Sequence, residues 1–395
     1  MSVIAMVADS MDIGGAERHV ITLSRELGAR GHEIRLLCSA AGPLMTEALD
    51  AGIDICVLGD EVVKRRVSSE YIRFIAEELR RTPADIVHAH MFASCVAAAA
   101  ALDGGRSRLV VTEHSEAVWR GAADEALASA VYGQCAAVIA VSGAIARRLI
   151  ESDGVALDRV FTVPNAIGAI GYPSRSSSRR PKTAPVVGFI GRLRREKGVH
   201  HLLRAACSVL EAIPTARFVI VGDGPERARL EGDAALFGLS ASHLQFLGER
   251  PDGPALLREF DVLAVPSVEN EGTPLVVLEA VAAGVPVVAS RTGGIPEQVR
   301  HGSEALLVEP GDPSALARAL LEVLADPIGA ERRATLAQQR LDTTFRLSTM
   351  VDAVEHVYRS TADRSSGILV REARRARRSG PVRDRGAVPT STGER

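Results

Sequence analysis

The chain lacks the features that mark secreted, metal-binding and nucleic-acid-binding proteins. Its five cysteines are scattered over 395 residues without a Cys-x-x-Cys pair, which argues against a disulfide framework or a zinc site and fits a reducing cytosol. The formal net charge of −2 gives no overall attraction to nucleic acid. We therefore expect a cytoplasmic protein with no metal site and no nucleic-acid partner.

Long apolar segments are also missing. The N-terminal run is short, is broken by Asp9 and Asp12 and has no basic segment before it, so we interpret it as a first strand and not as a signal peptide. No stretch approaches the roughly 20 uninterrupted apolar residues of a membrane helix. The length of the chain instead suggests two globular domains.

What is present is a regular alternation of short apolar runs with amphipathic helical patterns. In the first part of the chain, strands are predicted at 3–8, 33–38, 52–58, 85–90, 108–112, 137–141 and 160–163, and helices at 16–30, 69–81, 94–102, 126–135 and 143–151. Such alternation predicts a doubly wound parallel sheet. Gly14 and Gly15 form the first turn, where backbone N–H groups can approach an anion, but without the GxGxxG spacing this signal is weak.

The second part of the chain repeats the pattern. Residues 169–184 are rich in Gly, Ser, Pro and Arg and predict a linker. The sequence thus predicts an α/β protein of two Rossmann-like domains, 1–168 and 185–345, that face a cleft. Residues 361–395 predict a disordered basic tail; a minority alternative is an amphipathic segment at 368–378 that touches an anionic membrane.

The stretch from 261 to 297 contains an unusual helix. The pattern at 275–283 is apolar almost all round, which predicts burial, yet Glu279 lies in its middle. Thr273 and Pro274 before it have the form of an N-cap and a first helical residue. A buried carboxylate must be paired or hydrogen-bonded. Glu279 therefore either pairs within the core or, together with Glu271, accepts hydrogen bonds from the hydroxyls of a ligand.

Cations and histidines follow other predicted strands. Arg192 and Lys197 lie just beyond the strand at 186–190, where two positive charges suit a departing diphosphate; the alternative is a solvated basic turn. A further group lies at strand ends of the first domain, where doubly wound sheets bind ligands: His88, His90, His114 and Asn165. A diphosphate site beside carboxylates for polyols suggests a sugar nucleotide.

Nine segments in this order resemble a known family. They are GGAERHV (14–20), TEHS (112–115), AVSGAIARRL (140–149), VPNAI (163–167), GFIGRLRREKGVHHLL (188–203), VGDGPERARLE (221–231), FLGER (246–250), EGTPLVVLEAVAAGVPVVAS (271–290) and TGGIPE (292–297). The chain up to about residue 360 resembles the retaining glycosyltransferases of family 4, also called glycosyl transferases group 1, which have the GT-B fold. Glu271 and Glu279 fit the family's Glu-x7-Glu pattern.

The resemblance implies a role for each matching residue. Arg192 and Lys197 hold the donor diphosphate, Glu279 binds the ribose, and His114 lies near the donor sugar. Glu271 holds the sugar and the β-phosphate together with backbone groups of Gly272, Thr273, Pro274 and Leu275. Gly14 and Gly15 close onto the phosphate or sugar, and backbone near Arg250 meets the base. The catalytic set is then His114, Glu271, Arg192 and Lys197.

The resemblance also implies a chemistry. Sugar passes from a nucleoside diphosphate sugar, which is a co-substrate and not a cofactor, to a glycan, lipid-linked or small-molecule acceptor. Configuration is retained without a metal ion, and the leaving diphosphate helps to deprotonate the acceptor. The helix at 346–360 crosses back to the first domain. On the acceptor side we name His90 and Trp119 as candidates.

Several alternatives stay open. Many relatives have Phe-Gly where this chain has Thr273-Pro274, so the donor is not specified, and Ala-Ile-Gly after Asn165 departs from the usual hinge sequence. A non-hydrolysing sugar-nucleotide epimerase and a catalytically silent binding scaffold are the competing functions. The basic flank of the helix at 69–81 either meets an anionic membrane, placing the protein peripherally on its inner face, or is solvated.

Overall fold

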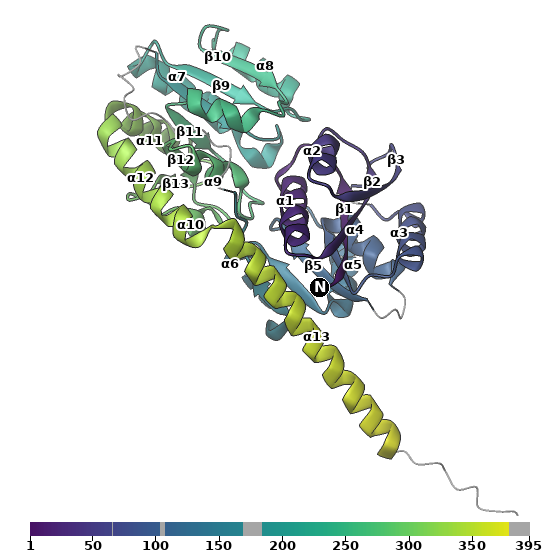
Figure 1. Ribbon diagram of the computed structural model, residues 1–395. Coiled ribbons are helices and arrows are strands. Elements are labelled where there is room, and N and C mark those ends of the chain that lie inside the picture. Colours follow the sequence, from purple (N-terminus) through teal and green to yellow (C-terminus); the bar gives the residue numbers. More distant parts are fainter. Residues whose placement is uncertain (65, 103–106, 169–183, 379–395) are drawn as a thin grey trace, which may run out of the picture.

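Two parallel β-sheets, formed by successive parts of the chain, organise the protein (Figure 1). The computed structural model describes the backbone of residues 1–64, 66–102, 107–168 and 184–378, and the side chains of these ranges as far as residue 362. The predicted linker at 169–184 falls almost wholly outside these ranges. The prediction of two doubly wound α/β domains is confirmed.

The first sheet has seven strands in the order β3-β2-β1-β4-β5-β6-β7, all parallel. Its strands are β1 (Val3–Ser10), β2 (Glu33–Ala40), β3 (Asp54–Gly59), β4 (Ile86–His90), β5 (Arg108–Glu113), β6 (Ala137–Ala140) and β7 (Val160–Thr162). The helices of this domain are α1 (Gly15–Ala29), α2 (Met45–Asp50), α3 (Ser69–Arg81), α4 (Phe92–Ala101), α5 (Ala122–Gln134) and α6 (Gly143–Glu151). The short α2 has no counterpart among the predicted elements.

The second sheet has six parallel strands in the order β10-β9-β8-β11-β12-β13. They are β8 (Val186–Ile190), β9 (Arg217–Val221), β10 (Leu244–Gly248), β11 (Val262–Val265), β12 (Val287–Ser290) and β13 (Leu306–Val308). The helices are α7 (Val199–Ala212), α8 (Arg227–Leu236), α9 (Leu275–Ala282), α10 (Ile295–Gln298), α11 (Pro313–Ala325) and α12 (Pro327–Thr344), with 3₁₀ turns at Arg195–Lys197 and Gly253–Glu259.

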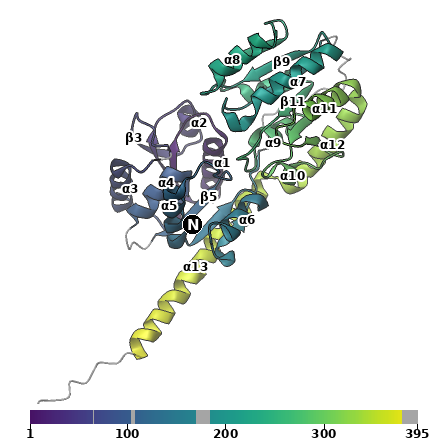
Figure 2. The same ribbon diagram turned by 180° about the vertical axis from the view of Figure 1, so that it is seen from behind.

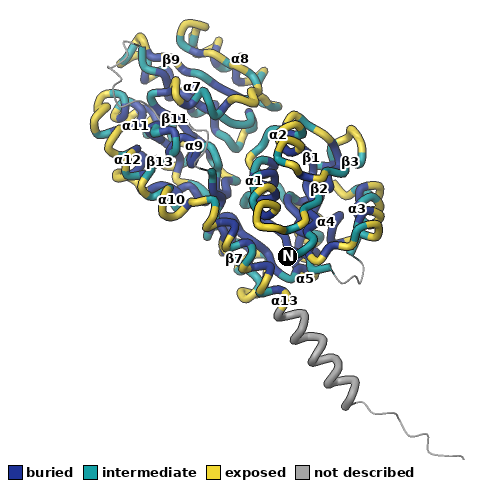
Figure 3. Tube along the Cα trace, viewed as in Figure 1, coloured by how far each residue is buried: buried dark blue, intermediate teal, exposed yellow. Residues whose placement is uncertain are grey.

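Helices bury both faces of each sheet (Figure 3). Along β1, Ile4 and Met6 join one core while Ala5 and Val7 join the core on the opposite face, because successive strand residues point to opposite sides. Strands buried on both faces read as continuous apolar runs. This is why the sequence locates most of them correctly.

The strand order of each sheet reverses at one point, between β1 and β4 in the first and between β8 and β11 in the second. Ligands of doubly wound sheets bind beyond the carboxyl ends of the strands at such a point. Gly14 and Gly15 follow β1, and Arg192 follows β8. Both reversal points therefore direct these residues toward the space between the domains.

The last helix, α13 (Leu347–Arg378), returns to the first domain (Figure 1). Val351, Val354 and Tyr358 join the core that contains Ile4 of β1, and Arg30, the C-cap of α1, binds Glu355 at 2.9 Å. The predicted crossing helix is thus present, but it is longer than expected. Residues 361–378 are helical, so the prediction of disorder from residue 361 is wrong there; residues 379–395 lie outside the described ranges.

Candidate active site

A cavity of about 460 Å³ lies between the two domains. Its first-domain wall includes residues after β1, β4 and β5, and its second-domain wall includes residues after β8, β9 and β11. All the donor-side residues named from the sequence line it: Gly14, Gly15, His114, Arg192, Lys197, Arg250, Glu271, Gly272, Thr273, Pro274, Leu275 and Glu279. The sequence therefore predicted a group of residues that are far apart in the chain but line one cavity.

Lys197 and Glu271 meet directly in this cavity. The Lys197 ammonium lies 2.6 Å from Oε1 of Glu271, and the Ser267 hydroxyl donates to the same oxygen at 2.6 Å. Lys197 ends the 3₁₀ turn, where Gly198 has φ of 68° and a Cβ would lie 1.9 Å from the Pro266 carbonyl oxygen. Only glycine permits this approach, so Gly198 fixes the lysine beside the loop that carries Glu271.

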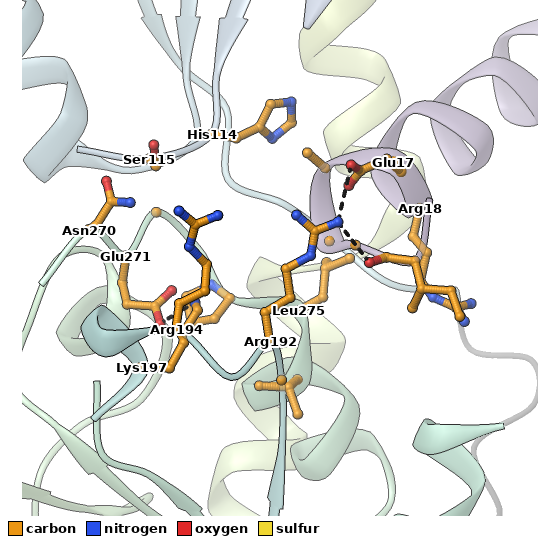
Figure 4. Close-up of a pocket in the computed structure, with 18 of the residues that line it drawn as sticks. Glu17, Arg18, His114, Ser115, Arg192, Arg194, Lys197, Asn270, Glu271 and Leu275 are labelled. Carbon is orange, nitrogen blue, oxygen red and sulfur yellow. Dashed lines mark hydrogen bonds and ion pairs between the residues drawn. The ribbon is translucent and has the colours of Figure 1, made fainter. Parts of the chain in front are cut away.

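Arg192 reaches across to the first domain (Figure 4). Its Nη2 donates to the Ile13 carbonyl at 3.2 Å and lies 3.9 Å from Oε1 of Glu17. Burial raises the pKa of Glu17, and the positive charge of Arg192 opposes this rise. Glu17 was not among the residues predicted from the sequence, although an acidic residue three positions after Gly14 is a recognisable signal at a helix N-terminus.

The loop that follows Glu271 is pressed against the first domain. A Cβ on Gly272 would lie 2.2 Å from the His114 carbonyl oxygen. The Asn165 amide donates to the Thr273 carbonyl at 2.9 Å, and the Thr273 hydroxyl donates to the Val141 carbonyl. The prediction of Thr273 as N-cap is therefore wrong: Pro274 occupies the cap in extended geometry and Thr273 instead binds the other domain.

His114 faces the cavity and is supported by buried histidines. Its Nε2 lies 3.1 Å from Nδ1 of His90, while His88 lies between the Tyr358 hydroxyl and Thr112 Oγ1, each at 2.7 Å. Burial lowers the pKa of His114 to about 3, so its imidazole is neutral at physiological pH.

His90 does not touch the cavity. It is fully buried, its pKa is lowered by burial, and it is absent from the cavity lining. The sequence placed it on the acceptor side because it ends a strand, yet its side chain lies behind His114. This acceptor-side prediction is not supported by the structure.

Three imidazoles are near enough to one another to be considered as metal ligands. One ring nitrogen from each of His19, His90 and His114 lies within 4.8 Å of the others. Burial lowers the pKa of His19, as it does those of the other two, and neutral imidazole is the form that binds metals. The absence of a metal site, expected from the cysteine pattern, stays a prediction.

Trp119 lines the cavity on the first-domain side. It packs edge-on against Phe92, with ring centroids 5.2 Å apart, and the Arg120 guanidinium lies 5.2 Å from the Phe92 ring. Arg120 is held by two contacts of 3.0 and 3.2 Å to Glu113. Trp119 thus lies in the first-domain wall of the cavity, and its role on the acceptor side stays a prediction.

Backbone strain gathers at the same cavity. The described non-glycine residues with positive φ are Met91, Ala117 and Asn270, at 67°, 54° and 63°, and all three line it. Such conformations cost about 1–3 kcal/mol and collect at functional sites. Glu279, only 6% exposed, also lines this cavity from α9, and its binding of a ligand stays a prediction.

Both halves of the chain are similar in sequence to known protein families. The family model described as Glycosyltransferase Family 4 matches residues 13–168, and that of glycosyl transferases group 1 matches residues 173–340. Glycogen synthase of Mycobacterium tuberculosis is 30% identical over 380 residues, covering 88% of this chain and 91% of its own. The chain belongs to glycosyltransferase family 4.

Other matches agree with this assignment. The 2-deoxystreptamine glucosyltransferase of Streptomyces kanamyceticus is 36% identical over 209 residues, half of this chain and 52% of its own. The crystal structure of Anabaena HepE in complex with UDP-glucose superposes with a TM-score of 0.81 at 23% identity, covering 91% of this chain and all of that one. This protein is a GT-B glycosyltransferase that uses a nucleotide sugar, and the epimerase and scaffold alternatives are not favoured.

Proposed function

We propose that this glycosyltransferase transfers a hexose from a UDP-sugar to an acceptor hydroxyl, with retention of configuration and without a metal ion. The observation that carries the proposal is the placement of Arg192 and Lys197 in one cavity with Glu271 and Glu279. Two cations neutralise a diphosphate, and two buried carboxylates accept hydrogen bonds from sugar and ribose hydroxyls. The UDP-glucose complex of Anabaena HepE suggests the nucleotide.

The proposed transfer reaction assigns roles to several of these residues. The bond from the anomeric carbon to the β-phosphate oxygen breaks, and the acceptor oxygen bonds to that carbon from the same face. The acceptor proton passes to the departing diphosphate, whose growing charge Arg192 and Lys197 stabilise. Neutral His114 offers hydrogen bonds to the sugar without competing for that proton, and α9 begins at the cavity wall, where a helix N-terminus favours phosphate.

The acceptor binds on the first-domain side, beside Trp119. A glycan, a lipid-linked sugar and a small polyol all remain in the proposal, because the names of the relatives cover glycogen, 2-deoxystreptamine and D-inositol 3-phosphate. Location in the cytoplasm and contact with an anionic membrane stay predictions. None of the helices within the described ranges has both the length and the apolar character that crossing a bilayer requires.

A donor and acceptor screen tests the proposal. Purified protein is incubated with UDP-glucose, GDP-mannose or ADP-glucose, with and without EDTA, and with maltooligosaccharides, 2-deoxystreptamine or inositol phosphate as acceptors. We expect release of UDP that EDTA leaves unchanged, and a product whose anomeric configuration by NMR matches that of the donor. A strict requirement for Mg²⁺ or Mn²⁺, or an inverted product, would refute the mechanism.

A further inference from the structure

A carboxylate of the second domain caps a helix of the first. Glu297, on α10, accepts hydrogen bonds from the backbone N–H groups of Gly143 at 2.8 Å and Ala144 at 3.0 Å, one on each carboxylate oxygen. These are the first two residues of α6. Figure 2 shows α6 and α10 close together between the two domains. The Ser142 hydroxyl accepts from the next N–H, that of Ile145, at 3.2 Å.

This contact is stronger than an ordinary surface pair. The N-terminus of a helix carries a partial positive charge, and a carboxylate there makes charge-assisted hydrogen bonds. Two oxygens on two adjacent N–H groups fix the direction of the carboxylate as well as its distance. The approach is close enough that a Cβ on Gly143 would lie 3.1 Å from Oε1 of Glu297, which fits the glycine at this position.

The same short helix also holds the loop at 272–274 that follows Glu271, here called the donor loop. Gly294, which precedes α10, donates its N–H to the Gly272 carbonyl at 2.9 Å, and the buried Gln298 donates its amide to the Pro274 carbonyl at 3.1 Å. Arg340 of α12 binds the Glu297 carbonyl at 2.7 Å. α10 therefore connects three parts: α6 of the first domain, the loop that follows Glu271, and α12.

We propose that Glu297 is a positioning residue that sets the angle between the two domains and, through α10, holds the donor loop against His114. Glu297 is not part of the cavity lining, so we expect its carboxylate to touch neither donor nor acceptor. The catalytic part of this inference rests on the proposed function, whereas the part about domain orientation does not. Misplacement of reacting groups by about 1 Å can cost on the order of 10²-fold in rate. A less rigidly fixed angle between the domains should therefore lower turnover.

Two variants and a matched control test the proposal. Glu297→Ala removes both acceptor oxygens, and Glu297→Gln keeps one. Glu309→Gln is the control, because Glu309 is an exposed carboxylate of the same domain that pairs only with Arg291 among the described residues, at 3.4 Å. Thermal melts by circular dichroism establish that each variant folds.

Measurements on the free protein decide the domain part. Small-angle scattering should show a broader or shifted distribution of interatomic distances for Glu297→Ala, with a smaller change for Glu297→Gln and none for the control. Hydrogen exchange at the amides of Gly143 and Ala144 should accelerate at least tenfold in Glu297→Ala. Unchanged scattering and unchanged exchange would overturn the proposal, whatever the donor of the enzyme.

Measurements with ligand decide the catalytic part. With UDP and UDP-glucose as probes, we expect the UDP dissociation constant to stay within twofold and UDP-glucose turnover to fall at least tenfold in Glu297→Ala. Equal losses of UDP affinity and turnover with normal scattering would assign Glu297 a ligand-binding role and overturn ours, as would wild-type turnover. If the wild-type protein releases no UDP from UDP-glucose, the proposed donor fails, while scattering and exchange still decide the positioning role.

Discussion

Two of the contact sets between the domains differ in character. One, here called the seam, consists of Asn165 and Glu297 with their partners Thr273, Gly143 and Ala144; the Asn165 pair is buried and the Glu297 contacts are partly buried. The other, here called the lip, consists of an exposed bond from Arg18 to the Pro251 carbonyl at 3.1 Å and a partly buried bond from Arg192 to the Ile13 carbonyl.

The two sets differ in the free energy that is lost when a contact breaks. A buried polar group that loses its partner costs about 1–3 kcal/mol, whereas exposed polar contacts contribute about 0–1 kcal/mol. The Arg192 contact also competes with the diphosphate of the donor for the same guanidinium. We therefore expect the lip to part for the donor while the seam acts as the pivot.

The largest effect is expected at Lys197, the cation that contacts Glu271 at the start of the donor loop. Lys197→Ala should lower turnover of UDP-glucose by at least ~10²-fold, because the charge that stabilises the leaving diphosphate is lost. Arg195→Ala is the control, since this arginine lies in the same turn but outside the cavity lining. Steady-state UDP release measures both; near-wild-type rates for Lys197→Ala would remove the lysine from the mechanism.

A smaller effect is expected from the seam itself. Asn165→Ala leaves the buried Thr273 carbonyl without its amide donor, so turnover should fall about tenfold and the free energy of unfolding by about 1–3 kcal/mol. Gln338→Ala removes a comparable amide–carbonyl bond of 3.2 Å that lies inside the second domain. Urea unfolding and turnover assays compare the two variants. Equal effects on turnover would contradict the claim that the seam contributes more to turnover than a bond inside one domain does.

Stability should also depend on pH through Asp9, a residue of the cavity wall. Asp9 accepts two hydrogen bonds from Ser94, yet burial raises its pKa from 3.8 to about 7. Between these values the folded protein keeps a proton that the unfolded chain has lost, so the free energy of unfolding falls as pH rises through this window.

Asp9→Asn should abolish that contribution. The wild-type protein also contains buried histidines, whose lowered pKa values act in the opposite direction, but these are present in both proteins. Urea denaturation at intervals from pH 4 to pH 8 therefore isolates Asp9 as the difference between the two curves. Parallel curves for wild type and variant would show that Asp9 does not hold a proton in the folded state.

The smallest effect is expected at the lip. Arg18 is partly exposed and also pairs with Glu47 at 3.3 Å, so Arg18→Ala should change UDP affinity and turnover by less than threefold. Titration of UDP by calorimetry measures the affinity. A loss as large as that of Asn165→Ala would contradict the distinction between lip and seam.

Much of the fold was predictable because its signals are local. Apolar periodicity identified α3 and α6 with their observed bounds. The tail at 361–378 was predicted wrongly, because its composition is typical of disorder although the helix that starts at Leu347 continues through it.

The sequence by itself determined the two alternating domains and the charged residues that end their strands, since both depend on neighbours within a few positions. Only the tertiary structure decided which of these residues share one cavity. It placed His90 behind His114, brought Glu17 to Arg192, and joined Glu297 to Gly143, 154 positions away in the chain. No local pattern encodes such contacts, because they join residues of different strands or of different domains.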